Sequence, residues 1–173
     1  KNWTYPPLVE AYEAESLSGV PKEALMPDDL SASRQSVEMK PGGAVLTFSC
    51  DLQPSTYAVY IVGRSPREAD KGDPGSLPPF FFTVAVTDPA GAVQRYRLRA
   101  AYQHVYTLTY GAEEMQRCYF QAFTPGAYKV EVAAGPGNTA GALLVDRLEL
   151  RDVLGNCAKK AGKTSRTMIG DEA

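Results

Sequence analysis

The chain has 173 residues, of which 44% are hydrophobic, and a formal net charge of -2 at pH 7. This length supports one well-buried core and is short for two. The near-neutral charge gives no global electrostatic reason to bind nucleic acid or an anionic membrane, so a charged partner would be recognised locally. The sequence has no run of 18 apolar residues, its first residues lack the layout of a signal peptide, and it begins without Met. We therefore expect a processed product or an excised piece of a larger protein.

Turn residues divide the sequence at short intervals, which is typical of an all-β protein. One of them, Asp88-Pro89-Ala90-Gly91, is a strong hairpin signal. The apolar stretches between the turns predict about nine strands, enough for a two-sheet antiparallel β-sandwich. In chain order the expected strands are 9–15, 44–50, 57–62, 80–86, 93–99, 105–110, 118–123, 127–132 and 143–150.

Little of the remaining sequence predicts regular structure. Pro21–Leu30 and Ala112–Gln116 are long enough for a helical turn or two, without the periodicity of a packed helix. Ser65–Pro79 is rich in Pro, Gly and charged residues and predicts a long exposed loop. The tail has no aromatic residue, so we expect the module to span 1–154 and 155–173 to be a polar linker or the start of a following domain.

The register of one strand follows from its alternation. In AYKVEV, Val130 and Val132 alternate with Lys129 and Glu131. Successive side chains of a strand point to opposite faces, so the two valines should be buried while Lys129 and Glu131 face water.

The late stretch LLVDRLELRD carries an acidic residue on an apolar face. Leu148 and Leu150 alternate with charged residues, which predicts a half-buried strand, and Asp146 falls on the apolar side. A buried carboxylate costs several kcal/mol, on the order of 2–7, unless a cation or hydrogen-bond donors compensate it.

Two glutamates near the other end of the chain complete a candidate metal site. Glu13 and Glu15, in the triplet EAE, are two residues apart and could supply the other half of an oxygen cage around Asp146. Calcium is the ion that such a set of hard oxygen ligands favours, and we expect it in a structural role. The alternative is that both glutamates simply face solvent on an edge strand.

Aromatic and arginine residues are the candidates for ligand binding. Trp3 and Tyr102 lie outside the regular alternation that fills the core, so their rings are candidates to stack on a sugar, although a core or surface-filling role is common for such residues. Arg95, Arg97 and Arg99 alternate on one face of a strand, and such a row suits an acidic polysaccharide. The alternative is a solvated face that discourages edge pairing.

Catalysis has little support in the sequence. The single histidine, His104, has no partner at a spacing that would mark a triad or a metal site. The three cysteines, Cys50, Cys118 and Cys157, lack metal-ligand spacing, and their odd number leaves at least one thiol free or externally paired. We interpret the domain as non-catalytic and expect mainly reduced thiols.

The order EAE, then PGAYKVEVAAG, then LLVDRLEL resembles family six and family thirty-five carbohydrate-binding modules, which belong to the galactose-binding-like superfamily. The resemblance covers about residues 9–152 and implies a jelly-roll sandwich. It also implies a structural calcium, which maps onto Glu13, Glu15 and Asp146.

The sequence departs from the family pattern at the sugar site. Modules with a sugar site in the loop cleft often carry Asn two positions before the final-strand aspartate, where this chain has Leu144. Asn138, in the preceding loop GPGNTAG, is a candidate to replace it.

The resemblance implies a function as well as a fold. We expect a non-catalytic carbohydrate-binding module of a larger, secreted or periplasmic polysaccharide-degrading enzyme. Its expected partners are a polysaccharide and a neighbouring catalytic domain of the same chain. The arginine row would suit the polysaccharide if that polysaccharide is acidic. We expect no nucleic acid or membrane partner. The alternative, favoured by Leu144, is an accessory structural domain of the same fold that packs on a catalytic domain and binds no sugar.

Overall fold

The computed structural model describes residues 5–28, 31, 33–64, 80–100, 114–138 and 143–155. These residues form ten β-strands and two short 3-10 helices. The strands are β1 (Leu8–Glu13), β2 (Leu25–Pro27), β3 (Gln35–Met39), β4 (Val45–Leu52), β5 (Ser55–Arg64), β6 (Phe80–Thr87), β7 (Val93–Ala100), β8 (Glu114–Ala122), β9 (Gly126–Ala134) and β10 (Leu143–Asp152), and the helices are η1 (Ala14–Ser16) and η2 (Lys22–Ala24).

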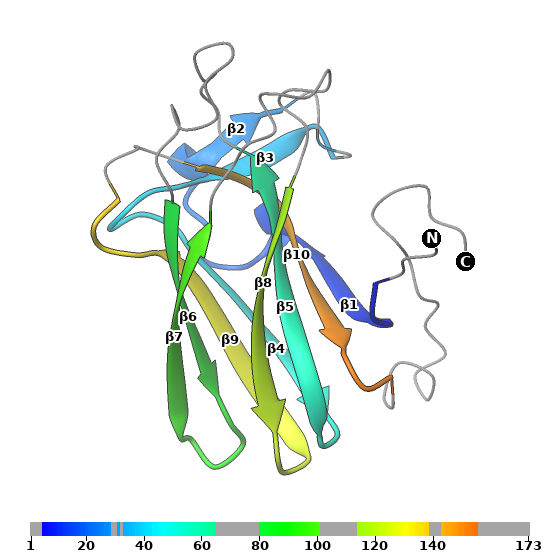
Figure 1. The fold of residues 1–173 in the computed structure, drawn as a ribbon. Coiled ribbons are helices and arrows are strands. Elements are labelled where there is room, and N and C mark those ends of the chain that lie inside the picture. Colours follow the sequence, from blue (N-terminus) through cyan, green and yellow to red (C-terminus); the bar gives the residue numbers. More distant parts are fainter. Residues whose placement is uncertain are drawn as a thin grey trace.

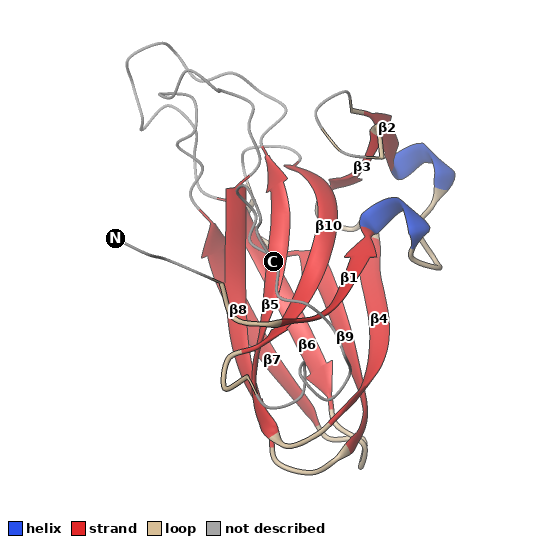
Figure 2. Cartoon of the chain, turned by 90° about the vertical axis from the view of Figure 1, so that its right-hand side faces the viewer, coloured by secondary structure: helices blue, strands red, loops and turns tan. Residues whose placement is uncertain are grey.

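The strands form two packed antiparallel sheets. One sheet has the order β2-β3-β10-β5-β8, with β1 also pairing β10, and the other has the order β4-β9-β6-β7. Figures 1 and 2 show the two layers face to face, with the β4–β5, β6–β7 and β8–β9 turns gathered at one end. This architecture confirms the expected all-β sandwich of two antiparallel sheets.

The core lies between the sheets and is built by strict alternation. In β9, Val130 and Val132 are buried while Lys129 faces water and Glu131 is only partly covered, which confirms the predicted register. In β6 every second residue from Phe80 to Val86 is buried in the same way. Burial at about 25 cal/mol per Å² of apolar surface is the main stabilising contribution to such a core.

Some expected elements differ from the structure. Ala112–Gln116 was expected to allow a helical turn, but β8 begins at Glu114 and pairs along β5. The short strands β2 and β3 were not expected, since three and five residues carry too little alternation to be recognised. The expected strand 105–110, the loop 65–79 and all but Gly155 of the tail 155–173 lie outside the described residues.

The late strand β10 is buried on both faces, so the prediction of a half-buried strand was wrong. Glu149 and Arg151, expected to face water, are 4% and 1% exposed. The segment before β1 covers them: Tyr5 packs edge-on against Tyr60, and the Pro6 carbonyl oxygen accepts a hydrogen bond of 2.7 Å from Arg151. The covering segment lies outside any strand, so alternation could not reveal it.

Candidate cation site and binding surfaces

The pairing of β10 changes at one residue, Asp146. Before it, Leu143–Val145 pair with β3, and after it, Arg147–Arg151 pair with β1. On the opposite side, the ladder to β5 is irregular between Val145 and Arg147. Such a bulge leaves the extra residue unpaired and re-aims its side chain. Because Glu13 pairs with Arg147, the fold places Asp146 beside the point where β1 ends and η1 begins. Figure 2 shows β1 running alongside β10 and leading into a short helix.

Three carboxylates near this junction have oxygens left unpaired. Glu13 ends β1 and Glu15 lies in η1, while Asp146 is 1% exposed. Glu13 Oε1, Glu15 Oε1 and Asp146 Oδ1 are buried atoms without a hydrogen-bond partner. We call these three residues the acid cluster. A buried carboxylate oxygen without a hydrogen-bond donor costs free energy, so each of the three atoms destabilises the folded state unless a donor or a cation reaches it.

The charges around the acid cluster are only partly balanced. Burial, and then the charges of Asp146 and Glu15, raise the pKa of Glu13 above its usual range. Arg147 donates to Asp146 Oδ2 at 2.8 Å and to Glu149 Oε2 at 2.9 Å, so this one guanidinium is shared between two carboxylates. The cluster thus keeps an excess of negative charge in a largely desolvated place.

The donor set of the acid cluster fits a hard divalent cation. Calcium takes six to eight oxygen ligands, largely from carboxylates and carbonyls, and three unpaired carboxylate oxygens would supply part of such a shell. In the described part of the chain, no three His, Cys, Asp or Glu side chains are already gathered in coordinating geometry. A bound cation would therefore have to draw the three oxygens together by changes in side-chain rotamers.

The structure describes only some of the predicted sugar-binding residues. Trp3 and Tyr102 lie outside the described residues, as does His104. Asn138 is described, and its side chain holds the backbone of β6: Oδ1 accepts from the Phe81 N–H at 2.7 Å, while Nδ2 donates to the carbonyls of Phe81 and Gly135 at 3.0 and 2.8 Å. The amide of Asn138 thus already has three backbone partners, and a sugar-binding role for it stays a prediction.

The arginine row lies on the outer face of the edge strand β7. Arg95, Arg97 and Arg99 are all exposed and stand opposite small or apolar residues of β6. Arg97 stacks over the Phe81 ring at 4.1 Å and reaches the Pro136 carbonyl oxygen at 3.5 Å. Among the described residues, Arg95 and Arg99 have no ion-pair partner, so the row is a strip of accessible positive charge.

A buried polar group that the sequence did not indicate lies near the start of β10. Arg64, the last residue of β5, forms an ion pair with Asp28, and Ser36 donates to the same carboxylate. All three side chains are buried, and Leu144 pairs with both Arg64 and Glu38. Nothing in the spacing of these residues could have identified the group, because the three come from separate strands and a loop.

Among the described residues, neither Cys50 nor Cys118 forms a disulfide; Cys118 is buried and Cys50 is partly covered. Burial raises the pKa of Cys118 to about 11, which keeps it a protonated, unreactive thiol at neutral pH. Cys157 lies outside the described residues.

Comparison with solved structures finds the same sandwich in carbohydrate-binding modules. A family 35 module from Clostridium thermocellum gives a TM-score of 0.54 at 13% identity, over 83% of this chain and 98% of that one. A family 35 module from Cellvibrio japonicus gives 0.53 at 9% identity, over 82% and 91%. The chain has the fold of these modules.

The same fold also occurs as one part of a larger enzyme. An exo-β-1,3-galactanase from Phanerochaete chrysosporium gives a TM-score of 0.53 at 14% identity, over 82% of this chain. The chain corresponds to only 29% of the galactanase. No family model matches the sequence, and no curated protein is significantly similar to it. Among the described residues, no helix has the length and apolar character needed to span a membrane.

Proposed function

We propose that this chain is a non-catalytic carbohydrate-binding module of a larger, secreted polysaccharide-degrading enzyme. The observation that carries the proposal is the likeness to isolated family 35 modules, which extends over 98% and 91% of their lengths. The parent enzyme is proposed from the galactanase, in which the matching part is a fraction of a longer chain. At these identities only the fold is shared, so the ligand has to be argued from this chain's own residues.

We further propose calcium as a structural ion of this module, held by Glu13, Glu15 and Asp146. The support is chemical: three buried carboxylate oxygens lack any partner, and Glu13 is under charge repulsion from the other two. A cation there would supply the missing electrostatic partner and tie the end of β1 to the start of β10.

For sugar recognition we propose the aromatic residues Trp3 and Tyr102 as stacking platforms. An aromatic ring binds the C–H face of a sugar, while hydroxyl groups need nearby polar side chains. Arg95, Arg97 and Arg99 would add a charge contribution if the polysaccharide is acidic. The exposure of this row, whose members Arg95 and Arg99 have no carboxylate partner among the described residues, supports this second part.

The test is retention of the purified chain on immobilised neutral, uronate-containing and sulfated polysaccharides, with Trp3→Ala and Tyr102→Ala alongside. Retention of the parent and loss in one of the variants would support the proposal. Retention unchanged in both variants would place the site on another surface. Absence of retention on every polysaccharide would overturn the binding function.

One alternative is favoured by a specific observation. Leu144 occupies the position where related modules often carry a sugar-binding Asn, and the amide of Asn138 is taken up by backbone groups. The chain would then be an accessory domain that packs on a catalytic domain and binds no sugar. Failure to bind any polysaccharide, together with co-purification with the catalytic domain as one compact unit, would favour this alternative.

A further inference from the structure

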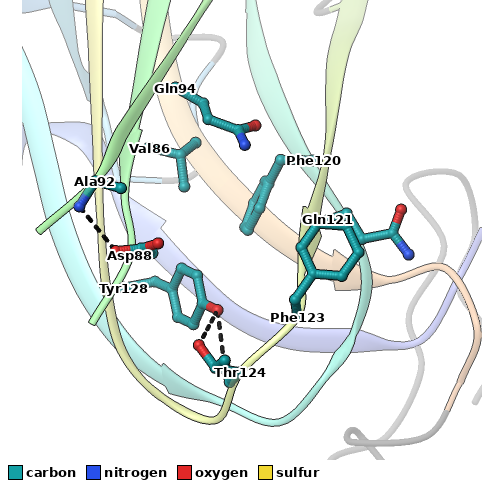
Figure 3. Close-up of a pocket in the computed structure, with 9 residues that line it drawn as sticks. All are labelled: Val86, Asp88, Ala92, Gln94, Phe120, Gln121, Phe123, Thr124 and Tyr128. Atoms are coloured by element: carbon teal, nitrogen blue, oxygen red, sulfur yellow. Dashed lines mark hydrogen bonds between the residues drawn. The ribbon is translucent and has the colours of Figure 1, made fainter. Parts of the chain in front are cut away.

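A recess lies at the hairpin end of the sandwich, far from the acid cluster. β10 begins at the opposite end from the gathered hairpin turns (Figure 1). The recess has a volume of about 100 Å³ and lies between the edge strands β7 and β8. Val86, Phe120 and Tyr128 line its interior, and all three are buried (Figure 3). We call this feature the hairpin recess.

The sequence of β7 explains why the recess exists. Gln94, Tyr96 and Leu98 share the inward face of this edge strand, and the last two pack on the core. At Gln94 this face holds an exposed polar side chain, so β7 adds no apolar group to the lining of the recess. In Figure 3 the Gln94 amide points into this space, toward the Phe120 ring.

The polar groups around the hairpin recess have unused hydrogen-bonding capacity. Asp88 Oδ1 accepts from the N–H groups of Ala90 and Ala92 at 2.9 Å each, while its Oδ2 has no protein partner among the described residues. Gln94 Oε1 accepts from the Tyr96 hydroxyl at 2.6 Å, which leaves the two N–H donors of its amide free. An acceptor and two donors thus border an aromatic interior.

An exposed aromatic ring forms the rim. Phe123 lines the recess and is 73% exposed, the largest value among the described large hydrophobic residues. It follows β8 directly in the turn before β9, so its position is set by a short connection between the two sheets. A ring beside polar groups that have no protein partner is the combination that recognises a hydroxylated ring, whose C–H face is apolar and whose edge forms hydrogen bonds.

We propose that the hairpin recess is a second ligand site, which binds a single neutral sugar ring at the end of a glycan chain. The proposal rests on the proposed carbohydrate-binding function. The volume of the hairpin recess lies below the range of about 300–1,000 Å³ for sites that enclose larger ligands, so the recess suits one sugar ring rather than several. Among the described residues, Asp88 is the only charged one that lines the recess, and its carboxylate disfavours an anionic sugar.

The experiment is titration of the isotopically labelled full chain with two neutral trisaccharides, β-1,3-galactotriose and cellotriose, followed by backbone amide NMR. We expect saturable shifts confined to residues 86–94 and 120–128. Phe123→Ala and Gln94→Ala should each weaken the affinity by about tenfold, the loss typical of truncating an important contact. The matched control is Tyr119→Ala, since Tyr119 is a 50% exposed aromatic of β8 that does not line the recess.

The outcomes separate this inference from the general function. Shifts at the hairpin end that are lost in Phe123→Ala and kept in Tyr119→Ala would support it. Shifts elsewhere only, or retention of the chain on polysaccharides without hairpin-end shifts, would overturn the second site while leaving the binding function intact. Absence of both trisaccharide shifts and polysaccharide retention would overturn both.

Discussion

Gly63 of β5 lies directly against the backbone of Leu144 in β10. A Cβ atom at position 63 would clash with the Leu144 carbonyl oxygen and stand 3.1 Å from the Cα atom of Val145. This close approach coincides with the irregularity in the β5–β10 ladder, where Val145 faces Gly63 and Arg147 faces Val62. The absence of a side chain on Gly63 therefore permits the bulge that places Asp146 beside Glu13 and Glu15.

Substitution of Gly63 should disturb both stability and the acid cluster. Gly63→Ala forces two backbones apart, and overpacking of this kind costs about 1–3 kcal/mol of unfolding free energy. The matched control is Gly135→Ala, whose Cβ would meet its first neighbour, the Phe81 carbonyl oxygen, only at 3.4 Å. Urea unfolding of the three proteins measures the difference. Equal stability of Gly63→Ala and the parent would contradict the tight approach of the strands.

The calcium proposal predicts a melting temperature that depends on metal. An ion that binds only the folded state stabilises it by about 2.7 kcal/mol when its concentration is 100 times Kd. The chain should therefore melt at a lower temperature in chelator than in calcium. Asp146→Asn should abolish this difference, whereas Asp51→Asn, which changes an exposed carboxylate of β4, should retain it. A melting temperature unaffected by chelator in the parent would exclude the site.

The raised pKa of Glu13 predicts a pH dependence in the metal-free protein. Burial and the charges of Asp146 and Glu15 raise this pKa above the unfolded value of 4.5. The folded state then binds a proton more tightly than the unfolded state, so the contribution of Glu13 to stability falls as pH rises from the unfolded pKa through the folded pKa. A cation that neutralises the cluster should remove this fall.

The measurement is chemical unfolding at a series of pH values in metal-free buffer, for the parent and for Glu13→Gln. We expect the stability of the parent relative to Glu13→Gln to decrease with rising pH in this window. In saturating calcium the parent should become the more stable of the two at neutral pH, since the ion uses the ionised carboxylate. A constant difference across the series would show that Glu13 titrates alike in the folded and unfolded chains.

The sequence predicted the layers of this fold because its long strands alternate. Val130 and Val132 are buried in a register that follows from the pattern alone, and the turn at Asp88–Gly91 separates β6 from β7 as expected. The burial of Asp146 could also be predicted, since it shares the apolar phase of its strand. The positions of Glu13 and Glu15 relative to Asp146 are set by the junction of β3, β1 and β10. The resemblance implied that these three residues lie together, and local pattern alone could not establish it.

Features that depend on contacts between distant segments could not be predicted. Arg151 is buried by Tyr5 and Pro6, which lie more than 140 positions earlier in the chain. Asn138 was a candidate to replace the sugar-binding Asn, and local sequence gave no sign that its amide bonds to the backbone of Phe81 in β6. The hairpin recess depends on Phe123 and Gln94, which come from edge strands of different sheets or the turns beside them.

The arginine row predicts how binding should respond to salt and charge. Arg95 and Arg99 are exposed and unpaired within the described residues, whereas Arg97 is engaged with Phe81 and the Pro136 carbonyl. An acidic polysaccharide on this face should therefore bind less tightly as ionic strength rises, because exposed charges are screened beyond about 8–10 Å at 0.1–0.15 M salt. A neutral polysaccharide should show no such dependence.

Affinity electrophoresis in uronate-containing and neutral gels at low and high salt measures this response. Arg95→Ala and Arg99→Ala should reduce retardation in the acidic gel and flatten its salt dependence, since each removes an accessible cation. Lys129→Ala is the control, because Lys129 faces outward from β9 but already lies 3.9 Å from Glu131. Arg97→Ala should affect binding and also loosen the loop at Pro136. If the acidic gel retards all variants equally at every salt concentration, the positive strip of β7 is a solvated edge and the acidic ligand binds elsewhere.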